Sequence, residues 1–138
     1  MRHFKFILII ILSTMVFASC DESDLFSDDP RDAFVGDWSV SENNAKKSAY
    51  LFYDVSIEKS VTDSTAVYIY NFYEIGNTLS VRAVVDGSRI SLPSQTVDGF
   101  TFYGSGTISY NDKSIEWLYT ADYNNGTVET LKATFTKK

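Results

Sequence analysis

The sequence predicts an all-β domain of eight antiparallel strands that follow one another up and down, preceded by an export signal. Three observations lead to this fold class. The chain beyond residue 33 is rich in Tyr, Phe, Val, Ile and Thr, turn residues recur at short intervals, and no window carries the apolar stripe of an amphipathic helix. Eight strands joined by short turns can close into a barrel, and a two-sheet sandwich is the alternative.

The N-terminus has the zones of a secretory signal. Arg2 and Lys5 supply positive charge, and residues 7–18 are an apolar stretch shorter than the roughly 20 residues of a transmembrane helix. Two small residues then precede Cys20, the single cysteine of the chain. We expect residues 1–19 to be a cleaved signal peptide.

The approach to Cys20 resembles the lipobox of bacterial lipoproteins, although Phe17 stands where those proteins usually have Leu. The resemblance implies lipidation at Cys20 and a lipid anchor in the cell envelope of a Gram-negative bacterium, at the outer membrane. The alternative is an ordinary signal cleaved near Ala18. Residues 20–32 are acidic and poor in apolar residues, so we expect a solvated tether there. In some surface-exported lipoproteins similar acids follow the cysteine, which implies surface exposure.

Charge narrows the choice of partners. The whole chain has a net charge of −6, and losing Arg2 and Lys5 with the signal peptide takes it to −8. Nucleic acid is excluded as a partner because binding phosphates needs clustered Lys and Arg. Membrane attachment must come from the lipid on Cys20 and not from charge.

Residues 33–138 should form the barrel domain. We expect strands at 34–42, 49–59, 65–72, 78–85, 88–92, 100–109, 113–122 and 127–136.

Three turns predict the registers of five of these strands. A two-residue Asp86-Gly87 turn pairs Val85 with Ser88, Ala83 with Ile90 and Val81 with Leu92. An Asn111-Asp112 turn sets Gly106 opposite Trp117 and Gly104 opposite Tyr119, so that small residues receive large ones. A three-residue loop at 124–126, with Gly126 left-handed, sets Trp117 by Ala133 and Ile115 by Phe135.

The first strand reads Phe34-Val35-Gly36-Asp37-Trp38, which resembles the G-x-W entry of lipocalins and fatty-acid-binding proteins. With the lipobox and the glycine-rich strand at 104–107, the chain resembles small lipocalin-like lipoproteins of Gram-negative bacteria. That resemblance implies a closed barrel whose Trp38 fills one end beneath a basic residue of the last strand, here Lys137. It also implies possible carriage of a small apolar ligand.

Two sets of candidate binding residues follow. On the carrier interpretation the interior set is Trp38, Phe102, Gly104, Gly106, Trp117 and Tyr119. Core packing is the competing role for these rings, and with Phe100 and Phe135 they would occupy much of a small barrel. A large cavity is therefore not expected.

The second set is an outer aromatic strip, predicted for binding a protein or a glycan. It depends on a loop of odd length near 60–64, which pairs Ile57 with Val67 and Val55 with Ile69. The strip then comprises Tyr50, Phe52, Tyr68, Tyr70 and Phe72. A four-residue loop would instead turn the last three inward.

We expect no enzyme, no cofactor and no metal. The single histidine, His3, leaves with the signal peptide, which removes His-dependent nucleophilic catalysis and the usual zinc sites. A carboxylate pair such as Glu116 with Glu58 or Asp54 is the one remaining catalytic arrangement, and these acids should face solvent.

Overall fold

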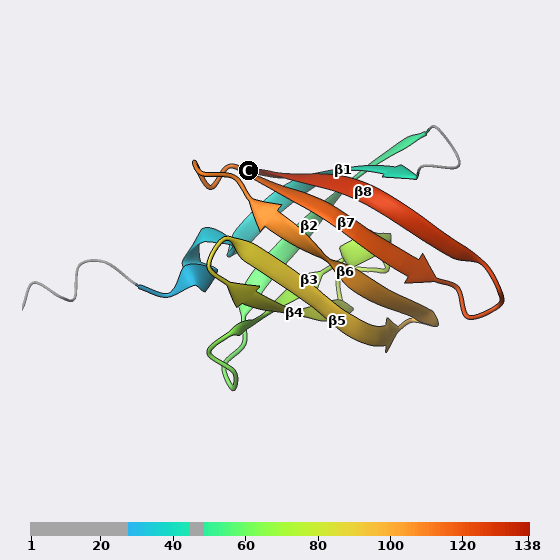
Figure 1. The fold of residues 1–138 in the computed structure, drawn as a ribbon, viewed down its shortest axis with the longest axis horizontal. Helices are drawn as coiled ribbons and strands as arrows, with labels where there is room; N and C mark the ends of the chain where they lie inside the picture. Colours follow the sequence, from blue (N-terminus) through green and yellow to red (C-terminus); the bar gives the residue numbers. More distant parts are fainter. Residues whose placement is uncertain (1–27, 45–48) are drawn as a thin grey trace, which may run out of the picture.

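The computed structural model describes residues 28–44 and 49–138. Eight antiparallel strands form one closed barrel, in which each strand pairs with the next and β1 also pairs with β8 (Figure 1). The predicted up-and-down fold class is confirmed, and the closure between β1 and β8 excludes the sandwich. The strands are β1 (Gly36–Asn44), β2 (Tyr50–Lys59), β3 (Ala66–Tyr70), β4 (Ser80–Asp86), β5 (Arg89–Val97), β6 (Phe100–Ile108), β7 (Ser114–Asp122) and β8 (Val128–Lys137). The signal peptide, Cys20 and most of the tether lie outside the described residues.

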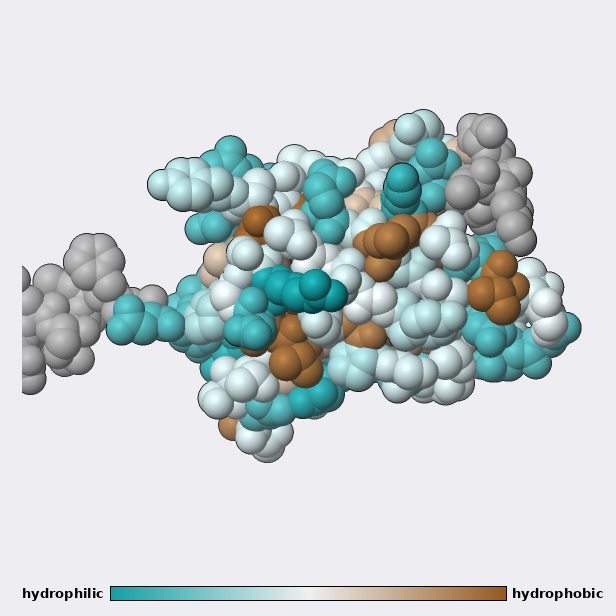
Figure 2. Space-filling view, viewed as in Figure 1, coloured by the Kyte–Doolittle hydropathy of each residue, from teal (hydrophilic) through white to brown (hydrophobic). Residues whose placement is uncertain are grey.

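Alternation along the strands builds the core. Successive side chains of a strand point to opposite faces, and in β7 and β8 nearly every second residue is buried. The outer face shown in Figure 2 carries apolar side chains only as separate spots among polar ones. The largest fully buried side chains are Trp38, Tyr119, Phe34, Phe72, Phe102 and Phe135.

Two of the predicted registers are confirmed. Gly106 lies opposite Trp117 and Gly104 opposite Tyr119 in the β6–β7 pair. A Cβ atom on Gly106 would lie 2.8 Å from the Trp117 ring, so this glycine receives the indole. In the β7–β8 pair Trp117 lies by Ala133, and Gly126 has a φ of 92°, as the three-residue loop requires.

The other two registers are each wrong by two residues. Val85 pairs with Ile90, because the β4–β5 loop is Gly87-Ser88 and not Asp86-Gly87. Gly87 alone adopts a positive φ there, of 58°, which spares Asp86 a left-handed conformation. Ile57 pairs with Ile69 and not with Val67. Both shifts are even, so the residues that remain within these strands keep their predicted faces.

Trp38 fills the closed end of the barrel, which is the end where β1 begins and β8 ends. Its ring is fully buried, and its indole N–H donates to the Phe34 carbonyl oxygen at 2.8 Å. The Lys137 ammonium lies 5.2 Å from the ring centroid and donates to the Ala33 carbonyl oxygen at 3.1 Å. The predicted pairing of Trp38 with a basic residue of the last strand is confirmed.

Arg31 fastens the N-terminal segment to this closed end. It lies in the short 3-10 turn η3 (Pro30–Ala33) and is only 8% exposed. Its guanidinium donates to the carbonyl oxygens of Ser60, Asp63 and Ala66 at 2.9–3.2 Å. Hydrogen bonds from Arg31 also hold the pKa of the Asp29 carboxyl well below its usual range. The chain therefore joins the barrel at a fixed point beside Trp38.

Candidate functional site

A pocket lies at the open end of the barrel, opposite Trp38, where the β3–β4 and β7–β8 connections meet the start of β2. Its volume is about 360 Å³. In Figure 1 this end lies opposite the blue N-terminal turn. The residues that line this open-end pocket are Glu42, Ala49, Tyr50, Leu51, Tyr73, Tyr123, Glu129 and Leu131.

Glu42 is a buried carboxylate at the floor of this pocket. Trp38, Val40 and Glu42 occupy alternate positions of β1, so the Glu42 side chain also points into the barrel. It is 3% exposed. The hydroxyl of Tyr53 donates to its Oε2 at 2.7 Å, and the hydroxyl of Tyr119 donates to the same atom. Burial raises the pKa of the Glu42 carboxyl above its ordinary value of 4.5, while the two hydrogen bonds oppose that rise.

Glu129 forms a second carboxylate group of the same kind. Glu129 lies two residues before Leu131 in β8, so both side chains point into the barrel, and Glu129 is 7% exposed. The hydroxyls of Tyr73 and Tyr123 donate to its Oε2 at 2.8 and 3.0 Å, and the two hydroxyl oxygens lie 2.6 Å apart. Each buried carboxylate of the open end is thus held by two tyrosines, as buried charge requires.

The β3–β4 connection brings Tyr73 to this site. β3 ends at Tyr70, and Asn71, Tyr73 and Glu74 all have φ values near +60° around the 3-10 turn η4 (Phe72–Glu74). Asn tolerates the left-handed conformation, but it is costly for Tyr73 and Glu74, and such costly conformations cluster at functional sites. The Asn71 side chain supports the turn, because it donates to the Asp54 carbonyl oxygen and accepts from the Gly76 N–H.

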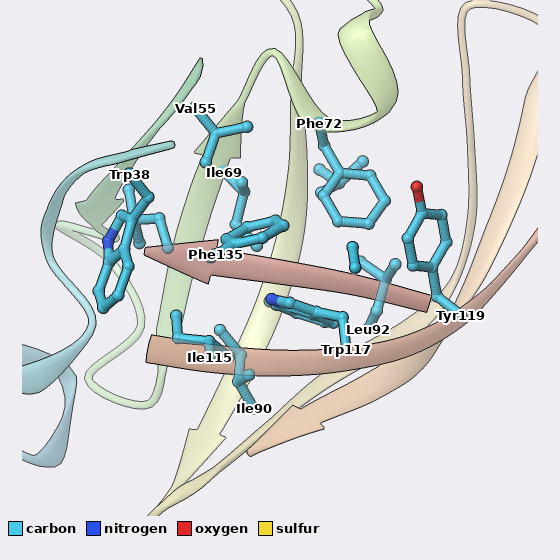
Figure 3. Close-up of a cluster of buried hydrophobic side chains, with 14 of the residues drawn as sticks. Trp38, Val55, Ile69, Phe72, Ile90, Leu92, Ile115, Trp117, Tyr119 and Phe135 are labelled. Atoms are coloured by element: carbon cyan, nitrogen blue, oxygen red, sulfur yellow. The ribbon is translucent and has the colours of Figure 1, made fainter. Parts of the chain in front are cut away.

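Phe72 was predicted to belong to the outer aromatic strip, and that prediction is wrong. The turn directs its ring into the barrel, where it is fully buried. Its centroid lies 4.7 Å from that of Tyr119, 5.8 Å from Trp117 and 5.5 Å from Phe102 (Figure 3). The predicted interior set does face inward, but these rings and Phe72 fill the space between them.

The rest of the outer strip is divided in two. Tyr50 and Phe52 are 64% and 72% exposed, and their rings stack at 6.4 Å beside the open-end pocket. Tyr68 and Tyr70 are half-buried and pair with Glu58 and Ser56, farther along β2. The predicted strip is therefore not contiguous, because β3 is shifted by two residues and Phe72 turns inward.

A second hollow of about 500 Å³ lies on the outer face near Tyr70. Asp54 belongs to it, and Lys138 donates to that carboxylate at 2.9 Å. The other lining residues are Asp37, Val55, Ser56, Glu58 and Asn77. This outer groove combines one aromatic ring with many polar groups.

The sequence prediction missed Glu42, Tyr53, Tyr73, Tyr123 and Glu129. The sequence did contain a sign of both glutamates, because each occupies an alternate position of its strand at which the side chain points into the barrel. No group of three or more His, Cys, Asp or Glu that could hold a metal ion occurs within the described ranges. In the same ranges, no helix is long and apolar enough to cross a membrane.

The fold and the pocket define a closed, eight-stranded up-and-down β-barrel with a site at one end. A redesigned β-barrel of known structure is similar to it, with a TM-score of 0.55 and 10% sequence identity over 80% of this chain and 96% of that chain. At this identity the likeness shows the fold alone. No protein-family model and no curated protein matches the chain.

Proposed function

We propose that this protein is a lipid-anchored envelope protein whose barrel binds a small ligand at its open end, without catalysis. The observation that carries the proposal is the open-end pocket, whose volume of about 360 Å³ suits a small molecule. Aromatic side chains fill the described part of the barrel below this pocket.

The attachment of the chain supports this assignment. Arg31 fixes residues 29–33 to the closed end, and only eight residues separate Cys20 from Asp29. Eight extended residues span at most about 28 Å. A lipid on Cys20 would hold the closed end toward the membrane, and the open-end pocket would then face away from it.

The composition supports the absence of catalysis. The chain has one histidine, His3, and one cysteine, Cys20, and both belong to the segments proposed for export and anchoring. The buried carboxylates of Glu42 and Glu129 are held by tyrosine hydroxyls, which are weak acids and bases at neutral pH. Binding of a small ligand requires neither a histidine nor a cysteine side chain.

Replacing Cys20 with serine is expected to abolish membrane attachment and acyl labelling, because serine cannot form the thioether that carries the lipid. The measurement is fractionation of cells fed a labelled fatty acid. A Cys20→Ser chain that still fractionates with membranes and still takes up the label would contradict lipidation at this residue.

The binding function is tested by native mass spectrometry of the chain isolated from its host's membranes in mild detergent. We expect a mass increment of a small molecule on the intact chain. A chain that carries a protein and no small molecule would contradict the proposal.

A protein or glycan partner is the second candidate function, and the outer groove favours it. Sugars are bound by aromatic rings that stack on them and by polar groups that bond their hydroxyls, and the groove offers Tyr70 with Asp54, Asn77 and Lys138. The exposed Tyr50 and Phe52 pair adds a second aromatic surface. Loss of partner binding in Tyr70→Ala, with the open-end pocket intact, would favour this function.

A further inference from the structure

The closed end of the barrel carries two loops whose tips present apolar side chains to solvent. Val61 lies in the β2–β3 loop and Tyr110 in the β6–β7 loop, and both side chains are fully exposed. In Figure 1 the green β2–β3 loop and the orange β6–β7 loop lie at the same end of the barrel as the blue turn η3. Because neither side chain is buried, the hydrophobic stabilisation of the fold does not account for them.

Backbone contacts hold both loops at the closed end. Ser60 and Asp63 of the β2–β3 loop accept hydrogen bonds from the Arg31 guanidinium at their carbonyl oxygens. In the β6–β7 loop the Lys113 carbonyl oxygen accepts from the backbone N–H of Lys137 at 2.9 Å, and the Lys137 side chain lies at the closed end. The two tips therefore belong to the end at which the N-terminal segment joins the barrel.

Hydrogen bonds within each loop also satisfy part of its backbone. The Ser60 hydroxyl accepts from the Asp63 N–H at 3.1 Å, and the Asn111 side-chain oxygen accepts from the Lys113 N–H at 3.1 Å. A polar group that is already paired costs less free energy to remove from water than an unpaired one. The loops can therefore approach a medium less polar than water without losing these bonds.

Charge does not draw this end of the barrel to lipid. Near the β2–β3 loop, Asp63 forms an ion pair with Arg82, and Lys59 forms one with Asp32. The chain as a whole is acidic. A contact between this end and a membrane would therefore depend on the apolar and aromatic tips, and it should not require anionic lipid.

The attachment of the chain identifies a membrane surface as the occupant of these tips. Only eight residues separate Cys20, the proposed site of the lipid, from Asp29 at the closed end. Eight extended residues span at most about 28 Å, so an anchored barrel keeps its closed end near the membrane. Tyrosine is favoured at membrane interfaces, because its ring is apolar while its hydroxyl stays in water.

We propose that the tips of the β2–β3 and β6–β7 loops rest on the membrane, with the side chains of Val61 and Tyr110 in its interface. This inference rests on the proposed lipid anchor and adds two further contacts to it. The anchor alone sets a maximum distance between barrel and membrane, whereas three contacts also set the orientation. The open-end pocket is then held on the side of the barrel away from the membrane.

The test is electron paramagnetic resonance of the lipid-anchored full chain, labelled with a nitroxide, in phosphatidylcholine vesicles. The label is attached to single cysteines introduced by Val61→Cys and Tyr110→Cys. Phe52→Cys is the matched control, because Phe52 is an exposed apolar residue near the open end. Collisions of the nitroxide with oxygen, which concentrates in lipid, are compared with its collisions with a water-soluble nickel complex. We expect the nickel collisions to be lost at positions 61 and 110 and retained at 52.

Three results would overturn the inference while leaving the anchor in place. The first is nickel collisions at all three positions on a chain that floats with the vesicles. The second is their loss at position 52 in place of 61 and 110, which would show that the open end meets the membrane. The third is shielding of 61 and 110 that disappears when the chain is diluted in the vesicles, which would show a contact between copies of the chain.

The wild-type chain separates these results from a failure of the proposed anchor. Cys20 is the single cysteine of the chain, and a lipid on its sulfur leaves no thiol for the nitroxide. We expect the wild-type chain to take up no label and to float with the vesicles. A wild-type chain that is labelled and stays in solution would overturn the anchor and the inference together.

Discussion

Replacing Trp38 with alanine is expected to lower the free energy of unfolding by about 3–5 kcal/mol. The indole is fully buried at the closed end, and its N–H satisfies the Phe34 carbonyl oxygen. Its loss leaves a cavity, an orphaned carbonyl and the Lys137 ammonium without its ring. The measurement is equilibrium denaturation by urea, followed by tyrosine fluorescence and circular dichroism.

Tyr110→Ala is the matched control. Tyr110 is fully exposed in the β6–β7 loop, so this substitution removes a large aromatic ring from the surface and not from the core. Its denaturation midpoint should stay near that of the wild type. If Trp38→Ala and Tyr110→Ala have the same denaturation midpoint, the stability of the closed end does not depend on Trp38. The resemblance to the first strand of lipocalins would then not extend to the structural role of this tryptophan.

Replacing Phe72 with alanine is expected to destabilise the barrel by a similar amount, about 3–5 kcal/mol, and to create an apolar cavity. Phe72 packs against the rings of Tyr119, Trp117 and Phe102 inside the barrel. A cavity lined by such rings stays dry and takes small apolar molecules. We therefore expect Phe72→Ala to be stabilised by added benzene or xenon, measured as a rise in the midpoint of thermal unfolding.

Phe52→Ala is the control, because Phe52 is the same residue type at 72% exposure on the outer face of β2. A wild-type chain that gains as much from benzene as Phe72→Ala would show that the interior already holds an apolar site. That result would favour the apolar-ligand carrier over a site at the open end.

The turns explain why so much of the barrel could be predicted from the sequence. Loop length in a hairpin determines register, and the side-chain period of two then determines which face each residue occupies. The β6–β7 and β7–β8 registers followed from the turns near Asn111 and Gly126, with glycines placed opposite large rings. The turn at Gly87 was misplaced by one residue, and the buried face was nevertheless correct.

The open end could not be predicted in the same way. The alternation of β3 continues through Phe72 in the sequence, and no glycine or proline marks the point at which the strand ends. The left-handed Asn71, Tyr73 and Glu74 are maintained by tertiary contacts, chiefly the burial of Phe72 and the bonds of Asn71. Contacts between residues that are distant in sequence produce no local sequence pattern, so the end of β3 and its turn could not be predicted.

Glu42 and Glu129 were missed for a different reason. Their inward phase was visible beside Val40 and Leu131, but a carboxylate in an inward position is costly unless it is partnered. The partners, Tyr53 and Tyr73 among them, come from strands and turns whose positions only the folded barrel provides. The site therefore depends on both the phase of the strands and the closure of the barrel.

The most direct test of the open end as the binding end is an NMR titration. The isotope-labelled full chain, held in detergent micelles, is titrated with the small-molecule extract of its host cells. We expect chemical-shift changes concentrated on Tyr73, Tyr123 and Leu131 around the open-end pocket. Changes concentrated instead on Tyr68 and Tyr70, or an absence of change at the open end, would contradict the account.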